Sequence, residues 1–232
     1  LEKGETVVRL VPPPDNDPLK TYHMHYNIGG YHFLCPKKNF NEDCPVCIFA
    51  SKLWRENNEQ SKAMAKSLFA RDRHYSPILV RGKEEQGIRW WSYGKEVFEF
   101  IIKLCLNPDY GDITDPDTGT DLVITITQPE GLKYPKTTVQ PRRATSKLTD
   151  KGKNDVKALL NSVPDLLSCL DRKTTEEIKA ILNESWLTEN NVENKSDNTE
   201  MEKYSSEEPV TETKNEGPKS IDEAFEELLG DK

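Results

Sequence analysis

The stretch Cys35–Cys47, CPKKNFNEDCPVC, holds three of the five cysteines of the chain. Cys44 and Cys47 are separated by two residues, a spacing at which a tight turn presents two thiolates to one tetrahedral metal ion. With an upstream histidine, the pattern His25-x9-Cys35-x8-Cys44-x2-Cys47 offers one imidazole and three thiolates. Zinc prefers such soft ligands, and a closed set of four leaves no position for a reactive water. The pattern therefore predicts one structural Zn²⁺ ion.

Two other interpretations compete for the cysteines. A redox Cys-x-x-Cys would be expected after a buried strand in an α/β pattern, which the sequence lacks, and ordinary buried thiols are the second alternative. The identity of the histidine is open, because His23 and His32 compete with His25 and the spacing does not separate them. Cys105 and Cys169 lie in apolar surroundings and are expected in the core. An odd, clustered set of cysteines favours a reducing, intracellular compartment over a secreted disulfide framework.

Strand-like and helix-like segments flank this stretch. Strands are expected over residues 5–11, 74–81, 87–93 and 121–128, with a hairpin over residues 21–34. Helical spacing covers residues 46–54, 61–69 and 95–106, and most of residues 147–186 with a break at Pro164. Residues 107–120 are expected to form a loop whose Asp109, Asp112, Asp115 and Asp117 cap turns rather than bind calcium. Several short strands with attached helices indicate an α+β fold with a small barrel or sandwich.

Charge and hydropathy divide the chain. Hydrophobic residues make up 34% and charged residues 31% of the 232 residues, which indicates that part of the chain is disordered. The net charge of −8 comes mostly from the end, because residues 195–232 hold 12 acidic and 5 basic side chains. No apolar run approaches the length of a membrane span, and no signal peptide is recognisable. The chain opens on Leu1 within a strand-like pattern, which indicates a fragment.

Cations and aromatic side chains alternate around the second strand pair. Single-stranded nucleic acid binding requires this combination, because cations pair with phosphates and rings stack on unpaired bases at roughly 1–3 kcal/mol per base. The alternative is a set of core aromatics with solvated charges around them; alternation places Trp90 on the face opposite Trp91 and Tyr93. The candidate contacts are Arg71, Arg73, His74, Tyr75, Arg89, Trp91, Tyr93 and Lys95, with Tyr134 and Lys136 in a second patch.

No catalytic motif accompanies these residues: the sequence has no Walker loop, no G-x-S-x-G, no H-E-x-x-H and no carboxylate cluster placed for two-metal chemistry. The prediction is a protein that is not an enzyme. The residues resemble a family at four places: Gly4–Pro12, the His25/Cys35/Cys44/Cys47 set, Pro77–Val80 and Tyr93–Lys95. Together they are similar to the single-stranded DNA-binding, helix-destabilising protein of T-even-like tailed bacteriophages.

The resemblance implies an OB-like β-barrel with an inserted zinc subdomain, peripheral helices and a disordered acidic C-terminal tail. It also implies DNA binding in a cleft beside the metal site, in phage replication, recombination and repair, in the cytoplasm of an infected bacterium. The resemblance further implies that copies of the protein associate with one another along DNA. The domain boundaries expected from it are a core over residues 1–187, a zinc subdomain over about 21–70, a disordered linker over 188–220 and a terminal segment over 221–232.

The terminal segment has a pattern of its own. Its apolar residues fall on one helical face among acidic neighbours, and a solubilising tail would have no use for them. Replication and recombination proteins are the expected partners of this stripe, which consists of Ile221, Phe225, Leu228 and Leu229. Two other functions remain open: a zinc-ribbon adaptor acting through the acidic tail, and a single-stranded RNA-binding protein, since stacking and phosphate contacts barely distinguish the two polymers.

Overall fold

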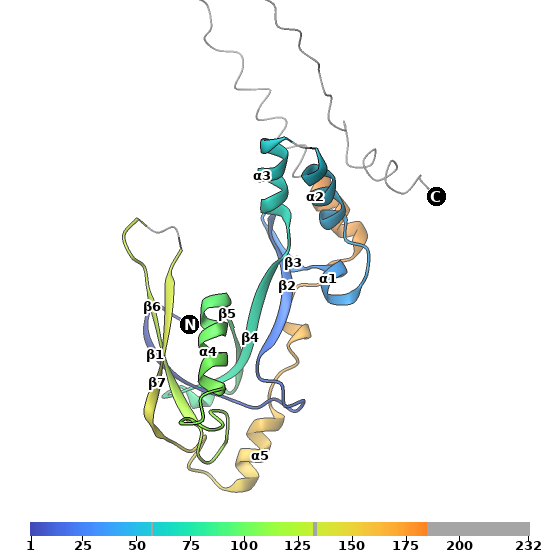
Figure 1. Cartoon of the computed structure of the whole chain (residues 1–232). Helices are drawn as coiled ribbons and strands as arrows, with labels where there is room; N and C mark the ends of the chain where they lie inside the picture. The colour runs from blue at the N-terminus through green and yellow to red at the C-terminus, as the bar shows by residue number, and fades with distance from the viewer. Residues whose placement is uncertain (57, 132–133, 185–232) are drawn as a thin grey trace, which may run out of the picture. The chain divides into compact units, whose positions relative to one another are not determined.

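The computed structural model describes residues 1–56, 58–131 and 134–184 (Figure 1). The chain forms two compact units. Among the described residues, the first unit consists of Leu1–His23 and Asp72–Asp171, and the second of Met24–Arg71 and residues 172–184. The predicted acidic linker and the terminal stripe lie outside the described residues.

An antiparallel sheet forms the first unit. Its strands β1 (Gly4–Leu10), β4 (Arg71–Val80), β5 (Arg89–Tyr93), β6 (Thr120–Thr127) and β7 (Lys136–Thr145) follow the order β5-β4-β1-β6-β7. Val8 pairs with Val80 on one side of β1 and with Leu122 on the other, so β1 is the central strand. The first residues of β2 (Lys20–Ile28) lie beside β4, where the Thr21 Oγ1 and His74 Nδ1 atoms are 2.8 Å apart.

The predicted strands are confirmed, and β7 is the strand that the sequence did not predict. Val139 is the one buried residue among its ten. Its Pro141 and its cations hide the alternation of a half-buried strand, so the sequence indicates only the second patch of candidate contacts around Lys136. The turn between β4 and β5 contains a short 3₁₀ helix, η1 (Glu84–Gln86).

One hydrophobic core draws residues from all five strands and from α4 (Lys95–Cys105). The side chains of the five strands and of α4 therefore pack into a single cluster between sheet and helix. The α+β prediction is confirmed. The prediction that Cys105 lies in the core is wrong: α4 buries Val97, Ile101 and Leu104, and Cys105 is one position, about 100°, beyond this face and is exposed.

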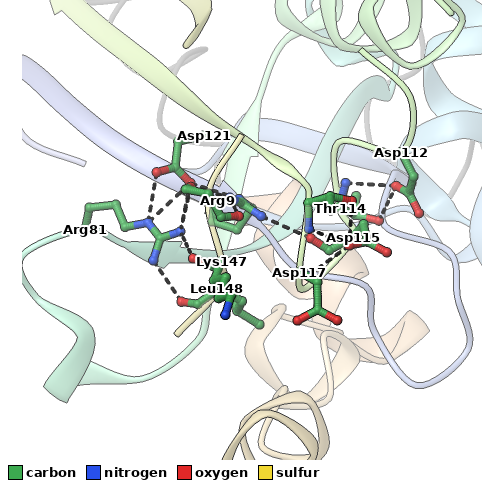
Figure 2. A network of polar contacts seen from close by, with 11 residues as sticks. Arg9, Arg81, Asp112, Thr114, Asp115, Asp117, Asp121, Lys147 and Leu148 are labelled. Carbon is green, nitrogen blue, oxygen red and sulfur yellow. Dashed lines mark hydrogen bonds and ion pairs between the residues drawn. The ribbon is translucent and has the colours of Figure 1, made fainter. Parts of the chain in front are cut away.

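Two arginines converge on one buried aspartate in this unit (Figure 2). Arg9 donates from Nε to Oδ1 of Asp121 at 2.8 Å, and Arg81 donates from Nη2 to the same oxygen at 2.9 Å. The guanidinium groups also donate to backbone carbonyls of Asp115, Ser146, Lys147 and Leu148. The network therefore fixes the loop before β6 and the segment after β7 to the sheet.

The loop before β6 turns as the sequence predicted. Asp112 accepts hydrogen bonds from the backbone and hydroxyl of Thr114, and Oδ1 of Asp115 accepts from the backbone N–H groups of Asp117 and Thr118. These carboxylates shape turns, as Asx motifs do. Gly119 has no room for a side chain, because an added Cβ would lie 2.6 Å from Nη1 of Arg9.

The segment after β7 is less helical than predicted. It contains α5 (Lys153–Asn161), the short 3₁₀ helix η2 (Leu167–Cys169) and a last helix over residues 175–184. The predicted break at Pro164 is confirmed. Cys169 is exposed rather than in the core, since η2 ends after a single turn and buries none of its residues.

The second unit combines a hairpin with helices. Strands β2 and β3 (Tyr31–Leu34) are joined through Gly29 and Gly30, both at positive φ, and confirm the predicted hairpin. Helices α2 (Pro45–Arg55) and α3 (Glu59–Leu68) confirm the two predicted helices. Between Cys35 and Cys44, Pro36–Phe40 forms the short helix α1, which Pro36 favours at its first position.

Candidate metal centre and nucleic-acid surface

Four predicted ligands meet inside the second unit. His25 comes from β2, Cys35 and Cys44 precede α1 and α2, and Cys47 lies in the first turn of α2. One ligand atom from each lies within 4.8 Å of all the others, and all four residues are buried. Residues separated by more than twenty positions in the sequence are thus brought to one point by the hairpin and two helix starts.

The spacing of these atoms fits a tetrahedral ion. The Sγ atoms of Cys35 and Cys47 are 3.4 Å apart, and Nε2 of His25 lies 3.3 Å from Sγ of Cys44 and 3.6 Å from Sγ of Cys47. A zinc ion with Zn–S of about 2.3 Å and Zn–N of about 2.0 Å would separate its ligand atoms by roughly 3.5–3.8 Å. The four residues could therefore hold one metal ion.

The imidazole of His25 is oriented for this role. Its Nδ1–H donates to the carbonyl oxygen of Leu68 at 2.8 Å, so Nε2 faces the thiols and is the nitrogen available to a metal ion. A backbone acceptor of this kind fixes the tautomer of a metal-bound histidine. Sequence reasoning missed this contact, since a carbonyl has no signature in the side-chain pattern.

The other two histidines have different partners. Nδ1 of His23 lies 2.7 Å from Oδ1 of Asp72, and Nδ1 of His32 accepts from the backbone N–H of Asn27 at 3.0 Å. Within the described parts of the chain, the cluster of potential ligands contains His25 and neither of these two.

The pKa values of His25 and Cys35 are shifted by burial and by hydrogen bonds within the cluster. Burial lowers the pKa of His25, but hydrogen bonds to Cys35 and Cys47 outweigh it and raise the pKa to about 9. The pKa of the Cys35 thiol is lowered, chiefly because the thiols of Cys44 and Cys47 donate hydrogen bonds to its sulfur and outweigh the effect of burial. A dication at this point would stabilise all three thiolates at once.

The candidate nucleic-acid contacts fall into an accessible and a buried group. Arg71, Arg89, Lys95 and Lys136 are exposed, Arg73 is half-buried, and Tyr134 is 71% exposed. Arg73 donates from Nη2 to the carbonyl and hydroxyl oxygens of Ser92, which holds its guanidinium against β5. Nζ of Lys95 lies 3.6 Å from a carboxylate oxygen of Glu99, one turn along α4.

The buried group consists of rings. His74, Tyr75, Trp91 and Tyr93 are each between 3% and 6% exposed. His74 stacks on Phe98 of α4 with ring centroids 3.9 Å apart and planes 9° from parallel, and Tyr93 donates to or accepts from Ser76 at 2.7 Å. Trp91 and Tyr93 share the core face of β5 and Trp90 lies on the other, as alternation predicted.

Comparison with known protein families identifies a relationship. A family model described as gp32 DNA binding protein like matches residues 2–185. The matched range contains the four candidate ligands and all ten candidate nucleic-acid contacts. No curated protein matches the chain. Among the described residues, no helix combines the length and apolar character that crossing a membrane demands.

Proposed function

Because the chain belongs to the gp32 DNA-binding-protein-like family, we propose that it binds single-stranded DNA without sequence preference and without catalysis. The family match over residues 2–185 is the observation that carries the proposal. The accessible cations described above support it, since sequence-tolerant binding needs phosphate contacts distributed along a surface.

In the first unit, phosphate contacts fall to Arg73, Arg89, Lys95 and Lys136. Arg73 has a preorganised guanidinium, because its hydrogen bonds to Ser92 reduce the freedom it would lose on binding. Each cation that neutralises a phosphate releases a counterion from the strand, so the affinity should fall steeply with salt. Arg71, at the start of β4 in the second unit, is a further candidate for a phosphate contact.

Base stacking falls first to Tyr134, whose ring is the most accessible among the candidate aromatics. Its position just before β7 places it near Lys136, so one short segment offers a ring and a cation. The buried rings of His74, Tyr75, Trp91 and Tyr93 are not proposed to contact DNA. Their packing instead fixes the positions of β4 and β5, the strands that carry Arg73 and Arg89.

The metal in this proposal is one structural Zn²⁺ ion held by His25, Cys35, Cys44 and Cys47. Three thiolates and one imidazole form a soft, closed ligand set of the kind that zinc occupies in structural sites. When bound, the ion supplies folding energy to the second unit rather than a reactive water. No step of DNA binding passes through it.

The wider proposal follows the family. DNA replication, recombination and repair are the processes in which such a protein acts, inside a bacterial cell infected by a phage. Ile221, Phe225, Leu228 and Leu229 are proposed to contact replication and recombination proteins, with residues 188–220 as a disordered linker. These residues lie outside the described part of the chain, and their pattern in the sequence supports the proposal.

A titration of the full chain tests the function. Oligo(dT), oligo(U) and a duplex of equal length are added at low and at high salt while tryptophan fluorescence is recorded. We expect the tightest binding to oligo(dT), with an affinity that falls as salt rises. Absence of oligo(dT) binding at low salt would overturn the proposal, and a preference for oligo(U) would replace it with RNA binding.

A further inference from the structure

A groove of about 450 Å³ opens on the first unit, and its lining contains none of the candidate metal ligands or candidate phosphate contacts. It lies between the segment before β2, strand β5 and the segment that follows α5. Its apolar walls are Pro13, Pro14, Tyr22, Trp90, Pro164 and Leu167. The volume falls in the range of ligand-binding clefts, roughly 300–1,000 Å³.

The walls of this groove are fixed by internal contacts. The indole N–H of Trp90 donates to the carbonyl oxygen of Pro164 at 2.8 Å, which ties β5 to the segment after α5. The Tyr22 ring meets the Tyr75 ring edge-on, with centroids 6.3 Å apart. Because the donor of Trp90 is used internally, the indole offers the groove apolar surface. The groove is thus formed before any ligand arrives.

Charge around the groove is negative. Asp15 and Asp165 belong to its lining, and Asp17 lies next to them. The one cation of the lining, Lys20, is bonded to Asp15 and lies 3.8 Å from a carboxylate oxygen of Asp17. Asp15 and Asp17 therefore already neutralise this ammonium group, and Asp165 adds a further negative charge to the lining. Such a field repels phosphodiesters and attracts cations.

Rings and prolines beside carboxylates select a particular kind of ligand. Aromatic-lined grooves accept segments in the polyproline II conformation, whose prolines fit between the rings at little cost in entropy. A basic residue of the same segment would reach the carboxylates. We propose that this groove binds a proline-containing, positively charged segment of a partner protein. This site is independent of the proposed DNA binding.

Fluorescence anisotropy with the full chain tests the site. The probe is a short labelled peptide with a Pro-x-x-Pro core followed by two arginines, and two matched peptides carry glutamates for the arginines or alanines for the prolines. We expect saturable binding of the first peptide and an affinity about tenfold or more lower for each of the others. No binding of the first peptide, or equal binding of the glutamate peptide, overturns the proposal.

Variants locate the peptide on the protein. Leu167→Ala removes a wall residue that is 41% exposed. Asp165→Asn removes a charge but keeps an oxygen to accept the backbone N–H of Ser168, now at 2.9 Å. Each should weaken peptide binding about fivefold or more without changing the thermal unfolding midpoint. Asp109→Asn and Leu106→Ala are exposed controls and should change nothing.

Oligo(dT) is the competing ligand in the same assay. We expect Leu167→Ala and Asp165→Asn to leave oligo(dT) affinity unchanged and oligo(dT) to leave the peptide bound. If the oligonucleotide displaces the peptide and Leu167→Ala weakens oligonucleotide binding, the groove is a nucleotide site and the peptide proposal fails.

Discussion

Arg9 and Asp121 form an ion pair inside the first unit, with side chains that are 0% and 6% exposed. The same carboxylate binds Arg81, so one negative charge serves two guanidinium groups. Removing one partner from such a buried arrangement is more costly than the pair itself is favourable, because it leaves an uncompensated charge.

Asp121→Asn should therefore destabilise the protein by about 3 kcal/mol, the lower end of the range for breaking buried pairs. The lower end applies because the Arg81 side chain is 20% exposed and water can reach it. Urea unfolding measures the difference. Asp117→Asn, which changes an exposed aspartate in the loop before β6, is the matched control and should stay within about 0.5 kcal/mol of the parent. An equal effect in both variants would contradict the role given to Asp121.

Low pH should lower the free energy of unfolding, because it protonates the carboxylate of Asp121. Burial alone would raise the pKa of Asp121, but the hydrogen bonds and charge of Arg81, with the charge of Arg9, outweigh it and hold the pKa below its ordinary value. A lowered pKa in the folded state gives a stability contribution that is present above the unfolded pKa and lost as the pH falls through the folded one.

The free energy of unfolding, measured from neutral pH downward, should thus fall below about pH 4, the ordinary range of an aspartate. In Asp121→Asn this component of the fall should be absent, and the two curves should converge in acid. Curves that stay parallel throughout would show that Asp121 does not titrate with folding.

Gly119→Ala tests how closely the loop before β6 approaches the network. The added methyl group would lie 2.5 Å from the carbonyl oxygen of Asp115 and 2.6 Å from Nη1 of Arg9, both closer than real Cβ contacts. The loop or the guanidinium must move, and we expect a loss of about 1–3 kcal/mol in unfolding free energy. At Gly152 the nearest atom to an added Cβ is 3.7 Å away, so Gly152→Ala should be nearly neutral. If both substitutions leave the unfolding free energy unchanged, the loop before β6 can move away from Arg9 at little cost, and Gly119 is not required there.

Much of the fold was predictable because its signals are local. Alternation in residues 121–128 and helical spacing in residues 95–106 follow from a buried face on each element. The strand β7 lacked that signal, because Val139 is its one buried residue. The prediction that Cys105 is buried failed for a related reason. Helical spacing identifies an apolar stripe along α4, but the packing of α4 on the sheet decides which residues at the edge of that stripe are buried.

The sequence predicted the three cysteine ligands of the candidate metal centre but did not decide which histidine is the fourth ligand. Spacing in a sequence identifies ligands that share a turn, as Cys44 and Cys47 do. It does not identify a ligand on a distant strand, because that requires the register of the β2–β3 hairpin and the carbonyl of Leu68. The rings of β5 pose the same problem, since the sequence shows alternation but not which face of β5 becomes the core.

Loss of one thiol should abolish tight metal binding. Changes in the second shell of a metal site cost roughly 10–100-fold in affinity, so removal of a ligand should cost more than about 100-fold. Cys47→Ala should retain no zinc after purification and should become sensitive to proteases within residues 24–56, because an ion held by the four residues would join the hairpin to α2. Cys169→Ala removes an exposed thiol outside the cluster and is the matched control. Equal zinc content in both proteins, measured by mass spectrometry of the intact chain, would exclude this site.

DNA binding should separate into a stacking and an ionic part. Tyr134→Ala should weaken oligo(dT) binding by about 1–3 kcal/mol if its ring stacks on one base, and leave the salt dependence unchanged. Lys136→Ala should instead reduce the slope of log affinity against log salt by about 0.7, the loss of one phosphate contact on a single strand. Tyr31→Ala and Lys103→Ala, an exposed tyrosine on β3 and an exposed lysine on α4, are the matched controls and should retain both affinity and slope. Titrations at four salt concentrations give all the slopes together. If Tyr134→Ala lowers the slope and Lys136→Ala does not, the roles assigned to the two residues are wrong.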